Sequence, residues 1–334
     1  MKDKIIIGCD ISKKKLDFYC NKTEEFFICS NDDSGFEKLS AWIHQHQFDK
    51  DKIAIAFEHT GSYGKAITNF CINNNLEYYA VNAMEIKLSQ GITRSKNDKI
   101  DAKRIATYLF EKGYKLNPTK PINTSIEQIK LLRTSRDLLV KQRASIITSI
   151  KMYKETLKLN SQDIALASLE ETKRVMDNQI KYLEDQIFNN IRLNKELNKN
   201  YNLLISIVGV GHVIAVDTII TTNNFTKFNN WRQYASYCGC APFEKSSGTI
   251  KFKNRISSIA NKSLKSHLSS GAKSAMQHDQ EMKIYTYRKL EEGKTKACIT
   301  NVIRCKLIAR MFSVVKHQRE YQKNYSHNLA IQTS

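Results

Sequence analysis

Hydrophobic and polar positions along the first 115 residues follow two different periods. Short apolar runs bounded by turn-forming or charged residues indicate strands, and segments with apolar residues every three or four positions indicate helices. Strands are expected at 4–9, 15–20, 25–29, 52–57 and 77–81, and helices near 34–48, 62–75 and 96–112. The pattern predicts an α/β domain over residues 1–115.

The order of these elements, β-β-β-α-β-α-β-α, is that of an RNase H-like (RuvC-like) mixed sheet. Asp10 and Glu58 each follow an apolar run, at the exit of a predicted strand. Sites in α/β sheets form outside the carboxyl ends of strands, so we expect the two acids to converge there. Nucleases of this fold use two metal ions about 3.5–4 Å apart at a phosphate, and carboxylates are suitable ligands.

The helix expected at 96–112 would supply two more acids. Asp98 and Asp101 are three residues apart in its first turn, which places both on one face. Two acids this close repel each other unless a cation lies between them. The structural alternative is a capping box formed by Ser95 and Asp98, since acids also suit the first turn of a helix.

Residues 122–199 carry a second pattern. No Gly or Pro occurs from Ile122 to Val208. Apolar residues recur at three- and four-residue intervals at Ile129, Leu132, Leu139, Ile146, Ile150, Tyr153 and Leu157, and again at Met176, Ile180, Leu183, Ile187 and Ile191. Long helices paired as a coiled coil, with a reversal near 160–163, explain both series. Arg136 and Arg143 interrupt the first seam, and the segment is an oligomerisation arm, a nucleic-acid rail or only an intramolecular hairpin.

Residues 200–320 predict a mainly helical carboxyl-terminal domain, followed by a tail at 321–334. Gly209 and Gly211 alternate with apolar residues in a pattern that matches a helix-hairpin-helix. Such glycines let the backbone approach a phosphate, and the amides of the next helix can bind it. The alternative is an ordinary helix–turn–helix contact in a core. An aromatic run follows, at Phe225, Phe228, Trp231, Tyr234 and Tyr237, which is more typical of a core than of a base-stacking platform.

The charge of the chain favours a polyanionic partner. Its 334 residues include 53 Lys and Arg against 33 Asp and Glu, a net charge of +20, and nucleic acid is the commonest partner of so basic a protein. The acid-free stretch 245–273 adds the candidate phosphate contacts Lys245, Lys251, Lys253, Arg255 and Lys262. The longest apolar run, 203–220, contains polar residues and is short for a bilayer span, so no membrane partner is expected.

Localisation and redox state follow from weaker signals. No secretory signal is visible at the amino terminus, and the eight cysteines form neither a zinc pattern nor a disulfide framework. Buried free thiols in a reducing cytoplasm are expected. A resemblance to a bacterial protein family, carried by the motifs given next, further implies a location near the nucleoid.

Several motifs, taken together, resemble the DEDD transposases of the IS-one-ten (IS110-type) insertion sequences. Segments 8–13, 57–61 and 96–106 are similar to the acidic motifs of that family, and segments 241–243, 246–248 and 255–257 to motifs of its carboxyl-terminal transposase domain. Each motif is weak alone, but their order is specific and the resemblance covers most of the chain. Segment 260–262 departs from the family, with Ala-Asn-Lys in place of a usual Gly-Asn pair.

The resemblance implies a site-specific DNA recombinase that excises and inserts its own element, guided by a structured bridge RNA which that element encodes. The four acids would hold Mg²⁺, as two ions, and a serine directly before Gly would form a covalent link to DNA. This rule selects Ser247 as the nucleophile, with Ser246 as the fallback. Strand exchange needs several active sites, so a homo-oligomer is expected, with dimers joining into a tetramer through the long helices.

Two other functions fit parts of the same sequence. A metal-dependent nuclease similar to a Holliday-junction resolvase would use the acids with water as its nucleophile. A non-catalytic nucleic-acid-binding scaffold would use Asp98 only as a helix cap.

Overall fold

The computed structural model describes residues 3–59, 61, 63–89, 97–121, 123–160, 162–247, 250–256 and 260–322. Within these ranges the side chains of 244–247 and 250–255 are not described. The chain divides into two compact units, Met1–Pro121 and Ile122–Ser334. The long helices therefore share a unit with the residues that follow them.

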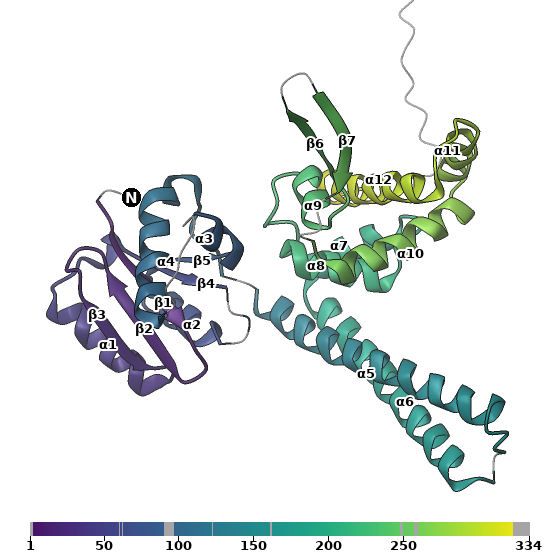
Figure 1. The fold of residues 1–334 in the computed structure, drawn as a ribbon, viewed down its shortest axis with the longest axis horizontal. Helices are drawn as coiled ribbons and strands as arrows, with labels where there is room; N and C mark the ends of the chain where they lie inside the picture. Colours follow the sequence, from purple (N-terminus) through teal and green to yellow (C-terminus); the bar gives the residue numbers. More distant parts are fainter. Residues whose placement is uncertain are drawn as a thin grey trace, which may run out of the picture. The chain divides into compact units, whose positions relative to one another are not determined.

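Unit 1 contains a mixed five-stranded sheet in the order β3-β2-β1-β4-β5 (Figure 1). Its strands are β1 (Ile5–Ile11), β2 (Lys15–Cys20), β3 (Phe26–Ser30), β4 (Ile53–Glu58) and β5 (Glu77–Val81). β2 runs antiparallel to both β1 and β3, whereas β1, β4 and β5 run parallel to one another. All five predicted strands are present, and the mixed sheet is compatible with an RNase H-like domain.

Helices cover both faces of this sheet. They are α1 (Asp33–Gln45), α2 (Lys65–Asn73), α3 (Ala83–Ser89) and α4 (Asp98–Lys112), with single 3₁₀ turns at Lys50–Lys52 and Gly113–Lys115. Buried residues of α1 and α2 pack on one face, and those of α3 and α4 pack on the other. The sequence pattern missed α3, because seven residues are too few for a clear helical period.

Close packing of α4 on β1 depends on Gly8. A Cβ atom at this position would lie 2.2 Å from the carbonyl oxygen of Ala102 and 2.5 Å from the backbone nitrogen of Ala106. Both contacts are with the backbone of α4, so a side chain there would displace the helix. Glycine at position 8 and alanine at 102 and 106 therefore let α4 lie directly on the strand that leads to Asp10.

Unit 2 begins with two long antiparallel helices, α5 (Thr124–Glu155) and α6 (Ile164–Leu193), which pack against each other (Figure 1). The predicted reversal at 160–163 falls between them, and the intramolecular hairpin is present. The two arginines that interrupt the predicted seam have partners on α6. Arg136 Nη2 lies 2.7 Å from Glu184 Oε1, and Arg143 Nη1 lies 2.7 Å from Asp177 Oδ1.

The remainder of unit 2 is a helical cluster with one two-stranded sheet. Its elements are α7 (Lys195–Ile205), α8 (His212–Thr222), α9 (Trp231–Tyr237), β6 (Pro242–Ser247), β7 (Ile250–Ile256), α10 (Lys262–His278), α11 (Gln280–Glu291) and α12 (Lys296–His317). The apolar run 203–220 includes the end of α7, the turn that follows it and most of α8. No helix in the described part of the chain is long and apolar enough to cross a membrane.

The aromatic run belongs to the core of unit 2. Tyr234 is fully buried, and Phe225, Phe228 and Trp231 are partly buried against the same core. The core interpretation is confirmed, although Tyr237 remains 36% exposed. All eight cysteines are free thiols, as predicted, and six of them are buried.

Candidate active site

Register places two of the predicted acids on one face of the sheet. Cys9 pairs with Phe57 between parallel strands β1 and β4, and both side chains are buried on the α1–α2 face. Side chains alternate along a strand, so Asp10 and Glu58, each one residue later, face the α4 side. The structure confirms that the two strand exits are adjacent.

The first turn of α4 carries the other two acids. Its N-cap is Asn97, whose side chain accepts a hydrogen bond from the backbone N–H of Lys99 at 3.1 Å. Asp98 is the first residue of the helix and does not cap it. The alternative that Ser95 and Asp98 form a capping box is therefore wrong, although Ser95 itself lies outside the described residues.

Burial and the neighbouring acids both act on the ionisation of Asp10. Partial burial and the charges of Asp101, Asp98, Asp17 and Glu58, in that order of importance, together raise the pKa of Asp10 to about 6. Carboxylates from β1, β2, β4 and α4 thus repel one another around Asp10. Such a site favours any cation that can lie among them.

Basic side chains hold two of these acids. Lys15 Nζ lies 3.2 Å from Asp98 Oδ2, and Arg104 Nη1 lies 2.8 Å from Asp101 Oδ1. Among the described residues, no three Asp, Glu, His or Cys side chains already have the spacing of a metal site. The donor set suits a hard divalent cation, but the acids must turn from their basic partners to bind it.

Asp17 is a fifth acid that the sequence analysis did not select. It lies directly opposite Asp10 in the antiparallel register of β1 and β2, so both side chains are on the α4 face. Asp17 is only 2% exposed, and its Oδ1 atom has no hydrogen-bond partner among the described residues. A charged residue inside the apolar strand 15–20 was the signal that could have identified it.

The candidate nucleophile lies in unit 2, at the end of β6. The backbone of Ser247 pairs with Ile250, and that of Ser246 pairs with Lys251, in a hairpin that the sequence did not predict. Gly248 lies outside the described residues, as do the side chains of both serines. Their roles therefore remain predictions.

The basic candidates cluster in sequence around the same hairpin. The backbones of Lys245 and Arg255 pair with Phe252 and Phe243, and Lys253 also belongs to β7. Lys262 is exposed and is the first residue of α10. Apart from Lys262, these side chains are not described, so phosphate contacts remain predictions for all of them.

The glycines between α7 and α8 have different surroundings. Gly209 has a φ of +93°, and a Cβ on it would lie 2.6 Å from the carbonyl oxygen of Gly271 in α10. Packing between helices therefore explains this glycine without a phosphate. Gly211 is the N-cap of α8 and has open space where a Cβ would be, so phosphate binding at this turn remains a prediction.

A cavity of about 790 Å³ lies beside the same turn, with mostly apolar walls. Arg133 and His267 contribute to its lining, and both are bound to Asp217. Arg133 Nε lies 2.9 Å and His267 Nδ1 lies 2.6 Å from the two oxygens of that carboxylate. This network joins α5, α8 and α10, and we interpret it as an interaction that stabilises the packing of these helices.

Two family models match the chain. One, the DEDD transposase model of the IS110 type, covers residues 7–156, and the other, described as transposase IS116/IS110/IS902 family, covers residues 201–287. The chain belongs to the IS110 family of transposases. The transposase is therefore an enzyme that cleaves and rejoins DNA, and membership of the DEDD group implies that it uses a divalent metal ion.

The transposase is also similar to curated proteins along most of its length. It is 29% identical to the pilin gene-inverting protein of Moraxella bovis over 96% of this chain and 98% of that protein, and equally to the protein of that name from Moraxella lacunata. It is 23% identical to the transposase for insertion sequence element IS1111A of Coxiella burnetii, over 83% of this chain and 79% of that protein.

Neutralising Asp10 should stabilise the metal-free transposase at neutral pH. The pKa of Asp10 is about 6 in the folded chain against an ordinary value of 3.8, so the folded state binds the proton more tightly and loses stability as pH rises between these values. With a chelator present, Asp10→Asn should raise Tm by roughly 3–5 °C at pH 7.5. The gain should disappear near pH 4, where Asp10 is already protonated. An equal change in Tm at both pH values would show that the pKa of Asp10 is not raised in the folded chain.

Proposed function

We propose that the transposase is a site-specific recombinase that excises and inserts its own insertion sequence, guided by a structured RNA which the element encodes. The observation that carries the proposal is that Asp10 and Glu58 lie at adjacent strand exits, with two more acids in the first turn of α4, in a chain that belongs to this family. RNA guidance rests on the family resemblance. The net charge of +20 supports binding of both DNA and RNA.

Asp10, Glu58, Asp98 and Asp101 would hold Mg²⁺, as two ions. When bound, Mg²⁺ would supply positive charge to the scissile phosphate. Asp10 and Glu58 are fixed on the sheet, whereas Asp98 is 61% exposed at the start of α4. The strand carboxylates would therefore set the position of the site, and the helix carboxylates would complete it by exchanging their basic partners for the cation.

Ser247 would attack the phosphodiester. A bond would form from Ser247 Oγ to phosphorus while the bond from phosphorus to one deoxyribose oxygen breaks. The serine proton would pass to a base or to solvent, and the departing oxygen would take up a proton. Attack by a deoxyribose hydroxyl of a new strand would reverse these steps and release the serine.

DNA inversion is a second candidate outcome. Two relatives named as pilin gene-inverting proteins match almost the whole length of this chain. Inversion and transposition require the same cleavage and rejoining of strands, and differ in which ends are joined. The proposed site serves either outcome without change.

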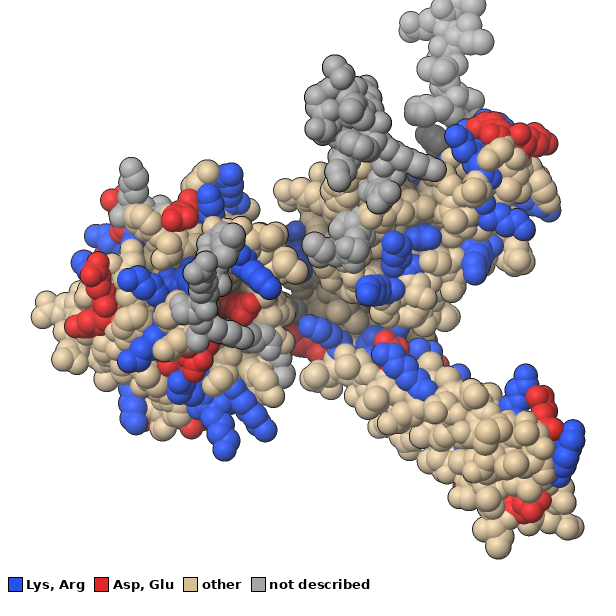
Figure 2. Space-filling view, in the orientation of Figure 1, with Lys and Arg blue, Asp and Glu red and all other residues tan. Residues whose placement is uncertain are grey.

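We also propose that the α5–α6 hairpin joins subunits, first into dimers and then into a tetramer. Leu131, Leu138 and Met152 are spaced by multiples of seven along α5, and Val175 and Tyr182 are spaced by seven along α6. All five are between 47% and 60% exposed. Figure 2 shows that the visible face of the hairpin is mostly free of charged side chains along its middle. Exposed apolar residues at heptad spacing are typical of a helix that binds another helix.

Replacement of the candidate nucleophile tests the reaction. On a DNA substrate that traps covalent intermediates, Ser247→Ala should form no protein–DNA adduct and should lower recombination by at least about 10³-fold, because no other group replaces the nucleophile. Ser246→Ala is the matched control, and it should form the adduct and recombine DNA as the wild type does. Denaturing gel electrophoresis of labelled DNA measures the adduct. Strand cleavage by Ser247→Ala at the wild-type rate would instead indicate a nuclease that uses water.

Polar substitution along the heptad residues tests the oligomer. The triple variant Leu131→Ser, Leu138→Ser, Met152→Ser should shift the protein from dimers or larger species to monomers, since it removes only exposed apolar contacts. Light scattering after size-exclusion chromatography measures the molar mass. Ile284→Ser is the control, because Ile284 is 60% exposed on α11, outside the hairpin. A wild-type mass in the triple variant would rule out this interface.

A further inference from the structure

Lys15 forms a bridge between two acids on different elements. Its Nζ atom lies 3.0 Å from Asp17 Oδ2 on β2 and 3.2 Å from Asp98 Oδ2 on α4. The lysine side chain is 42% exposed at the start of β2. Lys15 thus places a positive charge at the edge of the acid cluster, where solvent can reach it.

The inner partner of this bridge is a buried carboxylate with an unused oxygen. The side chain of Asp17 is 3% exposed, and Lys15 accounts for only one of its two oxygens. Asp17 also lies directly opposite Asp10, where like charges on neighbouring strands destabilise each other. A buried carboxylate oxygen without a partner is costly unless a cation compensates for it. The structure therefore contains negative charge that Lys15 alone does not neutralise.

We propose that Asp17 is a fifth carboxylate of the cation site, and that Lys15 is a tethered cation which occupies one side of that site until a divalent cation displaces it. The inference rests on the proposed function, because it assumes that the four acids bind metal. Asp17 adds negative charge to the site from within the sheet. Lys15 competes with the metal and keeps Asp98 near the cluster while no metal is bound.

The properties of the two side chains suit these roles. Asp17 is held in the middle of a central strand and cannot turn to solvent, whereas Lys15 has a long, flexible stem and can release Asp98 without any change in the backbone. An ammonium group and a divalent cation repel each other over a few ångströms. A lysine that only braced α4 would differ in one measurable respect, because its removal would loosen the site and weaken metal binding.

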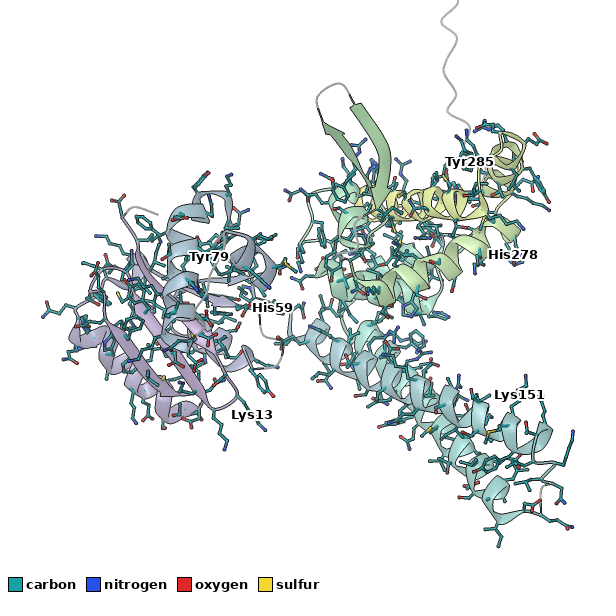
Figure 3. The ribbon with its side chains drawn as sticks, in the orientation of Figure 1. Lys13, His59, Tyr79, Lys151, His278 and Tyr285 are labelled. Carbon is teal, nitrogen blue, oxygen red and sulfur yellow. The ribbon has the colours of Figure 1, made fainter. Side chains whose placement is uncertain are left out.

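Direct binding of Mn²⁺ to the full-length protein tests the inference without any DNA reaction. The electron paramagnetic resonance signal of free Mn²⁺ gives the dissociation constant. Lys15→Met keeps the aliphatic stem and removes the charge, so it should lower the dissociation constant about tenfold. Lys13→Met is the matched control, since Lys13 is exposed in the same β1–β2 turn (Figure 3). It should change the constant less than about twofold, because solvent screens its charge.

The variant Asp17→Asn tests the role of the buried carboxylate in the same Mn²⁺-binding measurement. This variant should raise the dissociation constant for Mn²⁺ about tenfold, because it removes one negative charge from the site. Adding Lys15→Met to Asp17→Asn should then tighten binding less than Lys15→Met does alone, since the two side chains act on each other. Thermal unfolding with a chelator gives an independent readout. With the chelator present, Lys15→Met should lower Tm, because the charge that Lys15 places among the acids is gone. Excess Mn²⁺ should restore Tm.

The outcomes separate this inference from the proposed function. If the wild type binds Mn²⁺, Asp10→Ala abolishes that binding, and Lys15→Met binds no more tightly than Lys13→Met, the four-acid site stands and the role of Lys15 is wrong. If Asp17→Asn binds Mn²⁺ as the wild type does, Asp17 is not part of the site. If the wild type binds no Mn²⁺ at the acids, the metal site and this inference both fail.

Discussion

Repulsion among carboxylates gathered on one face of a small sheet is the constraint on which the rest of the amino-terminal unit depends. β1, β2 and β4 each place one acid on this face, and α4 places two more above them. Burial and then this repulsion raise the pKa of Asp10 to about 6. Lys15 and Arg104 neutralise part of the charge, and the remainder creates an affinity for cations.

Small residues make the gathering possible. Gly8 precedes Asp10 on the same face of β1, and its missing side chain lets α4 approach through Ala102 and Ala106. A bulkier residue at any of these positions would lift the helix and carry Asp98 and Asp101 away from the sheet. Glycine also permits close packing in unit 2, where Gly209 and Gly271 let the α7–α8 turn lie against α10.

Much of the amino-terminal unit could be predicted because its signals are local. Apolar runs identified all five strands, and an acid at a strand exit or in a first helical turn is visible in the sequence itself. Asp17 was missed because its importance comes from the pairing of β2 with β1. The β6–β7 hairpin was missed because its strands are polar and basic. The partner of Gly209, more than sixty residues away in sequence, could not be inferred without the packing of α10.

The candidate chemical groups of this DNA-rejoining enzyme are divided between its two units. The acids and their counter-cations are in the first unit, and the candidate serine and most of the basic candidates are in the second. Anomalous diffraction from crystals soaked in Mn²⁺ tests the central claim most directly. The account predicts a peak bound by Asp10, Glu58, Asp98 and Asp101, with Lys15 turned away from Asp98. A peak elsewhere, with those acids still paired to Lys15 and Arg104, would contradict it.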